Sequence, residues 1–476
     1  MNKKTVIIKS DNLSYSNFPY LPDKLYPELP STKINKNNFL YSGVRTLFHN
    51  LKLDQDNFNT KNWNPLKKYL KPNQTVLIKP NWVMHKNPAN KNSIQSLVTN
   101  SAIIKVVIDY CLIALKSKGK IIIADAPLQS CNFNKLLIKT KINILIDNYK
   151  KRFPEVVFEI IDLRITRLTN LNKLNQSQRQ EPGDPLGYTL VNLGTKSLLM
   201  DIAKYSSRFR VTNYNNKMLR EHHNSEVNEY LISNSVLNAN LIINIPKMKC
   251  HIKAGITGAL KNMVGINGHK EFLPHHITGD PSTGGDQYIH KSKIKEVYNK
   301  IYDNYWSSSI ENNLKKYFQL ILMDTLNKLS YIIDKDNLFD GGWQGNKTIP
   351  RTTVDINNIL YYYNLDKKIL SSKPVRNVLS IIDGIVAGEG DGPLRPIDKK
   401  AQVLIAGFNP LLVDLAMAKL VGFNIIKVKT LVYGLNNKRS KFKIKNLEEV
   451  CFSYNKKQIS LNKLPNLNFT KPQYWM

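Results

Sequence analysis

The sequence predicts an α/β fold, in which helices cover a mostly parallel sheet and a His- and Gly-rich, helical insertion interrupts the core. Apolar runs of strand length alternate with longer segments of helical apolar spacing from residue 76 onward, a pattern typical of parallel sheets. Hydrophobic residues make up 42% of the 476 residues, so the chain can form one large core or two domains.

The first part of the predicted core alternates strictly between strand and helix. Short apolar runs predict strands over residues 76–78, 121–124 and 156–161. Helical apolar spacing predicts helices over residues 101–118, which Gly119 ends, and 134–153.

The second part follows a polar segment, residues 164–187, for which we expect a loop or an excursion from the core. Apolar runs predict strands over residues 241–245, 379–382 and 403–406. Helices are expected over residues 226–238 and 409–421, and Gly422 stops the second of them.

Changes in composition divide the chain into five parts. They are an irregular N-terminal segment (1–70), the first part of the core (71–267), an insertion with a His- and Gly-rich loop and polar helices (268–375), the second part of the core (376–435), and a C-terminal hairpin and tail (436–476).

The charge of the chain is strongly positive. Lysine and arginine outnumber aspartate and glutamate by 69 to 36, so the formal net charge is +33. The lysines are spread over every region and arginine is scarce, whereas nucleic-acid-binding proteins concentrate charge on one face and interleave aromatic side chains. The net charge alone does not choose a partner, but its even spread leads us to expect no specific nucleic acid. An anionic small molecule is expected from the lysine cluster described below.

Cysteine spacing and the length of the apolar runs indicate the cellular compartment of the protein. The four cysteines form no CxxC pair, so neither a zinc ribbon nor a cysteine-ligated iron–sulfur cluster is indicated. The N-terminal run Val6-Ile7-Ile8 is too short for a signal peptide, and no later run reaches membrane-spanning length. These features favour a reduced cytoplasmic protein without a transmembrane segment. They leave open the oligomeric state and peripheral attachment to an acidic membrane surface.

Polar clusters directly follow four predicted strands. The clusters are Lys79-Pro80-Asn81, Asp125-Ala126-Pro127, Pro246-Lys247-Met248-Lys249 and Asp383-Gly384. Because the carboxyl ends of parallel strands meet at one edge of a sheet, we expect these clusters to form one ligand site.

The densest stretch, residues 245–268, surrounds a turn with Lys247, Lys249, His251, Lys253, Lys261 and Asn262. Gly255 and Gly258 let backbone amides approach a ligand, and Thr257 is expected to cap a short helix whose N-terminus attracts an anion. We expect a ligand with a phosphate or carboxylate group at this turn. Lys261 adds a positive charge or a nucleophilic amine of lowered pKa, whereas Lys253 is predicted to be solvated.

Histidines and a Gly-rich segment complete the set of candidates. Seven of the nine histidines lie between His222 and His290. His275 and His276 match no metal-ligand spacing, so we expect one of them to contact substrate, and the presence of a metal stays open. We expect residues 383–393 to form a Gly-rich loop after a strand, although they match no dinucleotide- or phosphate-binding motif. Asp383 is expected to bind a hydroxyl, a metal or a lysine.

Five segments resemble an uncharacterised family, the domain of unknown function 362. They are VLIKPNWV (76–83), IIIADAP (121–127), LIINIPKMKCHIKAGITGALKNMVGI (241–266), SIIDGIVAGEGDGPL (380–394) and VLIAGFNPLLVDLAMAKLVGF (403–423). The resemblance spans most of residues 71–425 and is closest to the branch with an insertion like LPHHITGDPSTGGDQY. It implies a role in surface-polysaccharide production. Ferredoxin-like electron transfer is not implied, because the cysteine motifs of some relatives are missing.

Residues 241–266 also resemble the lactate racemase family, which uses a nickel-pincer nucleotide tethered to a lysine. This resemblance implies that Lys261 would tether the cofactor, with His251 beside it. The second catalytic histidine of that family is missing, because Asp125-Ala126-Pro127 follows the corresponding strand. The cofactor therefore stays unknown, with a metal or a nickel-pincer nucleotide as the alternatives.

Together, these features predict an enzyme acting on a sugar acid or a phosphorylated carbohydrate. The candidate catalytic residues are His251 for proton transfer, Lys261, and Asp125 or Asp383 to orient the histidine or bind a hydroxyl. The candidate substrate-binding residues are Lys79, Asn81, Lys247, Lys249, Thr257, Asn262, His275 and His276. The alternatives are a lactate-racemase-like isomerase and a noncatalytic protein that binds anionic glycans or nucleotides.

Overall fold

The computed structural model describes residues 4–475 except 32, 169–177, 213–215, 308–312, 443, 445 and 448–449. Residues 169–177, inside the loop expected over 164–187, therefore lie outside the described part. On either side of them, β5 (Thr166–Leu168) and β6 (Gln178–Gln180) pair as an antiparallel ladder, so this segment is not wholly irregular.

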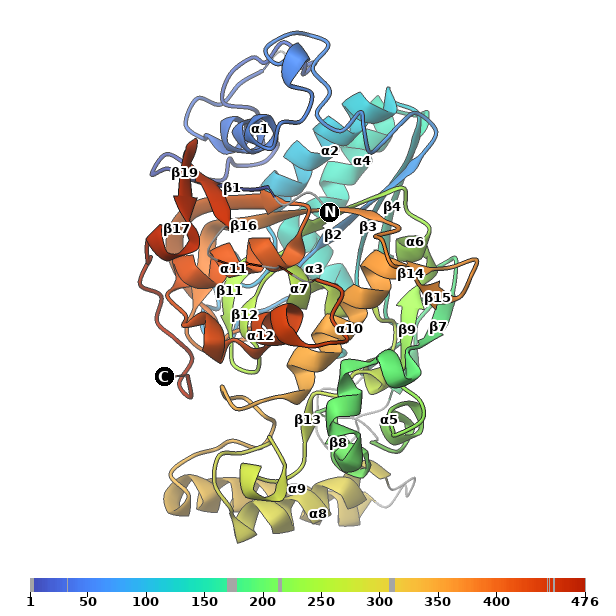
Figure 1. The fold of residues 1–476 in the computed structure, drawn as a ribbon, viewed down its shortest axis with the longest axis vertical. Helices are drawn as coiled ribbons and strands as arrows, with labels where there is room; N and C mark the ends of the chain where they lie inside the picture. Colours follow the sequence, from blue (N-terminus) through green and yellow to red (C-terminus); the bar gives the residue numbers. More distant parts are fainter. Residues whose placement is uncertain are drawn as a thin grey trace.

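A mixed sheet forms the centre of the molecule (Figure 1). Its main path runs in the order β19 (Lys457–Ser460), β18 (Cys451–Tyr454), β1 (Thr5–Lys9), β17 (Ile397–Gly407), β16 (Asn377–Glu389), β10 (Leu241–Ile245), β2 (Thr75–Pro80), β3 (Gly119–Asp125) and β4 (Val156–Asp162). Beyond the end of β10, β11 (Lys247–His251) continues alongside β16, and β12 (Gly255–Thr257) pairs back onto β11.

The five strands from β16 to β4 run parallel, so their carboxyl ends lie at one edge of the sheet. β17 and β1 add antiparallel neighbours on the other side. The predicted α/β class with a mostly parallel sheet is confirmed.

Two buried cores cover the two faces of this sheet because side chains alternate along each strand. Val76 and Ile78 of β2 point into one core, whereas Leu77 between them points into the other. The first core is closed by α1 (Leu40–Asn50), α2 (Ser101–Leu115), α3 (Phe133–Thr140) and α4 (Ile142–Arg152). The second is closed by α7 (Ala259–Asn262), α10 (Thr348–Tyr362), α11 (Pro410–Val421) and α12 (Lys429–Asn436).

Two of the predicted helices differ from the structure. The helix expected over 226–238 is wrong, because Glu229–Ser233 forms β9, paired with β7 (Tyr188–Asn192), and the short helix α6 covers only Asn234–Leu237. Alternating burial of Tyr230 and Ile232 explains the strand. The helix expected over 134–153 is interrupted at Lys141, whose φ of +58° ends α3 before α4 begins.

The expected segments at either side of the core also need correction. Residues 1–70 are not irregular throughout, since they supply β1 and α1. Every residue of α10 is buried, so this helix belongs to the core, although the sequence placed it among polar helices of an insertion. Its buried carboxylate, Asp355, accepts hydrogen bonds from the Ser197 and Tyr230 hydroxyls, which explains how such a polar helix is buried.

The remaining part of the insertion is a helical hairpin, α8 (Lys293–Ser307) and α9 (Asn313–Ile333), which lies apart from the sheet at the bottom of Figure 1. The outward side of α9 exposes large apolar side chains, among them Phe318 and Ile332. Within the described residues, neither α9 nor any other helix combines the length and apolar content needed to cross a bilayer.

The smaller elements complete the chain. β8 (Phe209–Arg210) pairs with β13 (His276–Ile277), and the short helix α5 covers Asn216–His222. β14 (Tyr363–Asn364) and β15 (Ile369–Leu370) form a separate hairpin. The expected C-terminal hairpin is present as β18 and β19, and β18 extends the sheet by pairing with β1.

Candidate functional site

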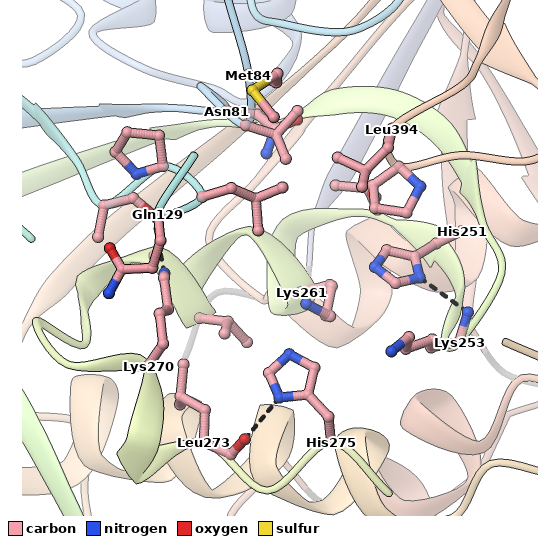
Figure 2. Close-up of a pocket in the computed structure, with 18 of the residues that line it drawn as sticks. Asn81, Met84, Gln129, His251, Lys253, Lys261, Lys270, Leu273, His275 and Leu394 are labelled. Carbon is pink, nitrogen blue, oxygen red and sulfur yellow. Dashed lines mark hydrogen bonds between the residues drawn. The ribbon is translucent and has the colours of Figure 1, made fainter. Parts of the chain in front are cut away.

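A cavity of about 330 Å³ opens at the carboxyl edge of β2 and β3. Asn81 and Asp125, at or just beyond the ends of these strands, form one wall, and His251 of β11 and Lys261 of α7 form another. His275, from the start of the insertion, closes the cavity (Figure 2). Residues far apart in the sequence are thus brought together at the expected edge of the sheet.

The parallel register of β2 and β3 explains the first wall. Ile78 pairs with Ile123, so the residues that follow both strands leave the sheet side by side. The Asp125 carboxylate forms an ion pair with the Lys79 ammonium at 2.7 Å. It also accepts a hydrogen bond from the Trp82 backbone N–H at 2.6 Å. Burial raises the pKa of Asp125, and the Lys79 ammonium opposes that rise.

Helix α7, which carries Lys261, is held at its N-terminus by Asp414 of α11. The Asp414 carboxylate accepts the backbone N–H groups of Ala259 at 2.5 Å and Leu260 at 2.9 Å. These amides are therefore occupied by a protein carboxylate, so the expected anion site at this helix terminus is wrong. The expected cap by Thr257 is also wrong, because Gly258 is the N-cap residue and makes no side-chain cap.

Lys261 is the central cation of the cavity. Its side chain is partly exposed to the cavity and has no hydrogen bond or ion pair to any residue that the structure describes. Desolvation lowers the pKa of Lys261 to about 7, and the nearby Lys270, Lys253 and Lys79 ammoniums contribute to the same shift. Near neutral pH this amine is thus divided between its charged and uncharged forms.

Two neutral imidazoles flank Lys261 (Figure 2). Desolvation lowers the pKa of both His251 and His275 well below the usual value, and the adjacent lysines lower it further. His251 Nδ1 accepts the backbone N–H of Lys253 at 3.0 Å, so the ring proton sits on Nε2. His275 Nδ1 lies 2.6 Å from the Leu273 carbonyl, to which it donates, so its Nε2 carries a lone pair.

The two rings therefore have opposite roles. His251 presents an N–H donor at Nε2, and His275 presents a proton acceptor at Nε2. Neither Nε2 atom has a hydrogen-bond partner among the described residues, so both remain available to a ligand.

Lys253 and Lys270 add two further positive charges to the lining. Lys253 pairs with Asp340 at 3.0 Å and is 8% exposed, so the expectation that it is solvated is wrong. Lys270 donates to the Ala126 carbonyl at 3.0 Å, and burial lowers its pKa to about 8. The lining holds three lysines and two carboxylates, of which Asp125 is already paired with Lys79, so the cavity is positive.

Four residues of the lining contribute buried polar atoms without a hydrogen-bond partner in the described chain. The atoms are Asn81 Oδ1, Trp82 Nε1, Gln129 Oε1 and Thr257 Oγ1. Buried polar groups are nearly always hydrogen-bonded, so two acceptors, a donor and a hydroxyl left unpaired mark a polar region behind the surface of the cavity. Both polar atoms of the Asn262 side chain have partners. Its Nδ2 donates to Asn244 Oδ1, and its Oδ1 accepts a hydrogen bond from Asn81 Nδ2.

Several candidates from the sequence do not line the cavity. Lys79 neutralises Asp125, and Lys247 is fully buried in an ion pair with Asp383 at 2.6 Å. Lys249 donates to the Leu97 carbonyl at 2.6 Å. His276 lies on β13 with its Nδ1 unpaired, and it too stands outside the lining.

Asp383 occupies a strand, which corrects the expected Gly-rich loop. β16 continues to Glu389, so Asp383 lies in its middle, opposite Leu404 of β17. The glycines that follow serve close strand packing, since a Cβ at Gly384 would lie 2.8 Å from the Val403 carbonyl.

Sequence reasoning missed six polar residues of the lining: Trp82, Gln129, Ser130, Thr212, Lys270 and Asp340. Trp82 and Gln129 stand next to the polar clusters after β2 and β3, so a wider window around each strand end would have included them. Lys270 fell just beyond the boundary expected at residue 267, and Asp340 follows no predicted strand.

Metal ligands are not gathered at this site. The described residues contain no group of three or more histidine, cysteine, aspartate or glutamate side chains arranged to hold a metal ion. The cavity thus offers amines, imidazoles and amide groups, which suit an organic anion.

Comparisons with known proteins identify one family. The family model described as Domain of unknown function (DUF362) matches residues 191–419. Small ribosomal subunit protein uS3m of Wickerhamomyces canadensis is 29% identical over 109 residues, covering 20% of this chain and 28% of that protein. A Thermotoga maritima protein of known crystal structure is 11% identical with a TM-score of 0.32, covering 75% of this chain and 58% of that one. This chain thus spans less than two thirds of either protein.

Proposed function

Because residues 191–419 of this chain form a domain of the DUF362 family, whose description states no activity, we propose a function from the cavity itself. The protein is an enzyme that binds a small hydroxylated anion, a sugar acid or a phosphorylated carbohydrate, and moves a proton on it. The observation that carries this proposal is the placement of Lys261, without a partner in the described chain, between two neutral imidazoles of opposite tautomer.

Charge and hydrogen bonding define the ligand class. The positive lining supplies ammonium groups for a carboxylate or phosphate. Asn81, Gln129 and Thr257 bring amide and hydroxyl side chains to the lining, which suits a hydroxylated ligand. A volume of about 330 Å³ is at the small end of ligand pockets, which suits a monosaccharide derivative.

The tautomers suggest the reaction. His275 Nε2 is the general base, and the Nε2–H of His251 is the donor to a developing oxyanion. Protonated Lys261 would stabilise the same negative charge. Proton abstraction from a carbon beside a carboxylate, followed by isomerisation, uses all three groups. This revises the role expected for His251, which the sequence had proposed as the proton-transfer group.

Asp125 and Asp383 do not carry the roles first expected of them in this proposal. Asp125 positions Lys79 and the Trp82 backbone at the wall, and Asp383 neutralises Lys247 inside the protein. The four cysteines are free, which fits the cytoplasmic location that we include in the proposal. The proposed place in surface-polysaccharide production rests on the family resemblance of the sequence alone.

Calorimetry with glucuronate, glucose 6-phosphate and neutral glucose tests the ligand class. The two anions should bind and glucose should not. Lys261→Met should weaken binding, whereas the exposed Lys328→Met should leave it unchanged. Absence of binding by both anions would reject the proposal.

Nuclear magnetic resonance in D₂O then tests catalysis. Wild-type protein should exchange the glucuronate proton beside the carboxylate, and His275→Gln should abolish this exchange without preventing binding. Anion binding without exchange in the wild type would instead indicate the noncatalytic binding protein that the sequence left open.

A further inference from the structure

Lys261 differs from the other buried lysines around it. Five neighbours each have a partner: Lys79 with Asp125, Lys247 with Asp383, Lys249 with the Leu97 carbonyl, Lys253 with Asp340, and Lys270 with the Ala126 carbonyl. Lys261 alone among these six has no hydrogen bond or ion pair in the described chain, although several polar groups lie nearby. A structural role does not account for this arrangement.

The surroundings favour the uncharged form of this amine. No carboxylate pairs with it, the Lys253, Lys270 and Lys79 ammoniums repel its positive charge, and desolvation adds to their effect. Apolar side chains, including Met84 and Leu273, complete the lining. An uncharged amine that faces a cavity is a nucleophile, which an ammonium paired with a carboxylate is not.

We propose that Lys261 Nζ condenses with the carbonyl carbon of an anionic aldehyde or ketone to form a protonated imine. This inference rests on the proposed function, since the same positive lining holds the carboxylate or phosphate of the substrate. It narrows the substrate class to anionic carbonyl compounds, which includes the open-chain forms of sugar acids and sugar phosphates.

The two imidazoles provide the proton transfers of this step. The amine attacks the carbonyl carbon, so an N–C bond forms as the C–O π bond breaks. His275 Nε2 accepts a proton from the nitrogen and returns it to the oxygen, which the Nε2–H of His251 stabilises. Overall, the amine, the carbonyl and one proton from solvent give the protonated imine and one water molecule.

The imine would then assist a proton transfer of the same kind, at the carbon beside the imine. A protonated imine withdraws electrons from the adjacent carbon, so a C–H bond there becomes acidic. His275 Nε2, free once the imine has formed, can accept that proton. Returning a proton to the opposite face of the same carbon, and then adding water to the imine, completes an epimerisation and restores Lys261.

Reductive trapping tests the proposal on the intact protein. Pyruvate serves as the anionic carbonyl probe and sodium cyanoborohydride as the reductant, at pH 7, with peptide mass spectrometry as the readout. We expect Lys261 to be modified at least about tenfold faster than the exposed Lys328. Equal rates at the two lysines would overturn the proposal, as would a Lys261 that is already modified in the protein as purified.

Variants of the histidines provide a readout that a structural role would not give. His275→Gln and His251→Gln should slow trapping at Lys261 and leave trapping at Lys328 unchanged, with circular dichroism verifying the fold. Exchange of the pyruvate methyl protons in D₂O should require both Lys261 and His275. Unchanged trapping in both histidine variants would contradict the mechanism.

The outcomes separate this inference from the proposed function. If glucuronate binds and exchanges its proton but pyruvate is never trapped on Lys261, the imine is wrong and the proposed function stands. If acetone, a neutral ketone, is trapped as fast as pyruvate, the anionic substrate class is wrong. If neither glucuronate nor glucose 6-phosphate binds, both proposals fail.

Discussion

The Nζ atom of Lys79 lies 2.7 Å from Oδ1 of Asp125, and both side chains are almost completely shielded from solvent. The pair stands at the ends of β2 and β3, where it joins two strands of the sheet to the wall of the cavity. Because Asp125 also accepts the Trp82 backbone N–H, the pair fixes the chain segment that carries Asn81. Lys79 thus acts through Asp125 and not on the ligand.

Asp125→Asn should lower the free energy of unfolding by about 3–5 kcal/mol, because it leaves the Lys79 ammonium buried without a countercharge. Urea denaturation measures this change. Glu155→Gln, which breaks the exposed pair of Glu155 with Lys118, is the matched control and should cost less than about 1 kcal/mol. Similar losses in the two variants would show that the Lys79–Asp125 pair is not a structural link.

Lys261→Met should make the protein more stable at pH 6, by on the order of 4 kcal/mol. The pKa of Lys261 is lowered to about 7 from 10.5, so between these pH values the unfolded chain binds more protons than the folded one. Wild-type stability attributable to Lys261 therefore rises with pH across this window, and the advantage of the variant shrinks toward pH 10. Urea melts at several pH values measure the difference. Parallel pH profiles would contradict a desolvated Lys261.

Gly258→Ala should weaken glucuronate binding and destabilise the protein by about 1–3 kcal/mol. A Cβ at this position would lie 2.1 Å from Asp414 Oδ1, so the carboxylate must leave the amides of Ala259 and Leu260. Helix α7 would then shift together with Lys261. Gly187→Ala, where the nearest atom is 3.9 Å away, should cost only the strain of its positive φ and leave binding intact.

The positions of the parallel strands could be predicted because apolar runs and turns are local signals. β2, β3 and β10 lie where the sequence places them, and their order in the sheet brings Asn81, Asp125, His251 and Lys261 to one edge. The prediction of a helix over 226–238 was wrong. The alternation of buried and half-buried side chains in β9 spans only five residues, too few to outweigh the helical spacing of apolar residues around it.

Which lysine faces the cavity without a partner could not be predicted, because this depends on partners distant in sequence. Lys247 and Lys261 look alike in the sequence, yet Lys247 pairs with Asp383 and Lys261 pairs with no described residue. The tautomers of His251 and His275 depend instead on backbone groups only two residues away, but the direction of these groups is set by the folded turns. These contacts, and not residue type, separate structural from ligand-facing groups.

The exposed face of α9 should bind an apolar fluorescent dye. Phe318 is 62% and Ile332 71% exposed on this helix, and further apolar side chains line the same hairpin. The double variant Phe318→Lys and Ile332→Lys should therefore reduce dye fluorescence, because large exposed apolar patches bind such dyes. Leu25→Lys, at an exposed site on the N-terminal segment, is the control and should leave fluorescence unchanged. Equal fluorescence in all three proteins would locate the dye site elsewhere.

Glucuronate affinity should fall as the pH rises above 7, by about tenfold between pH 6.5 and pH 9. Lys261, with a pKa of about 7, and Lys270, with a pKa of about 8, both lose positive charge across this range, while the carboxylate of the ligand stays ionised. A bound anion favours the ammonium form, so binding at pH 7.5 should take up protons, which calorimetry in buffers of different ionisation enthalpy detects. Lys261→Met should remove the part of this dependence centred near pH 7 and leave the part due to Lys270. A pH-independent affinity in the wild type would mean that neither amine faces the bound anion.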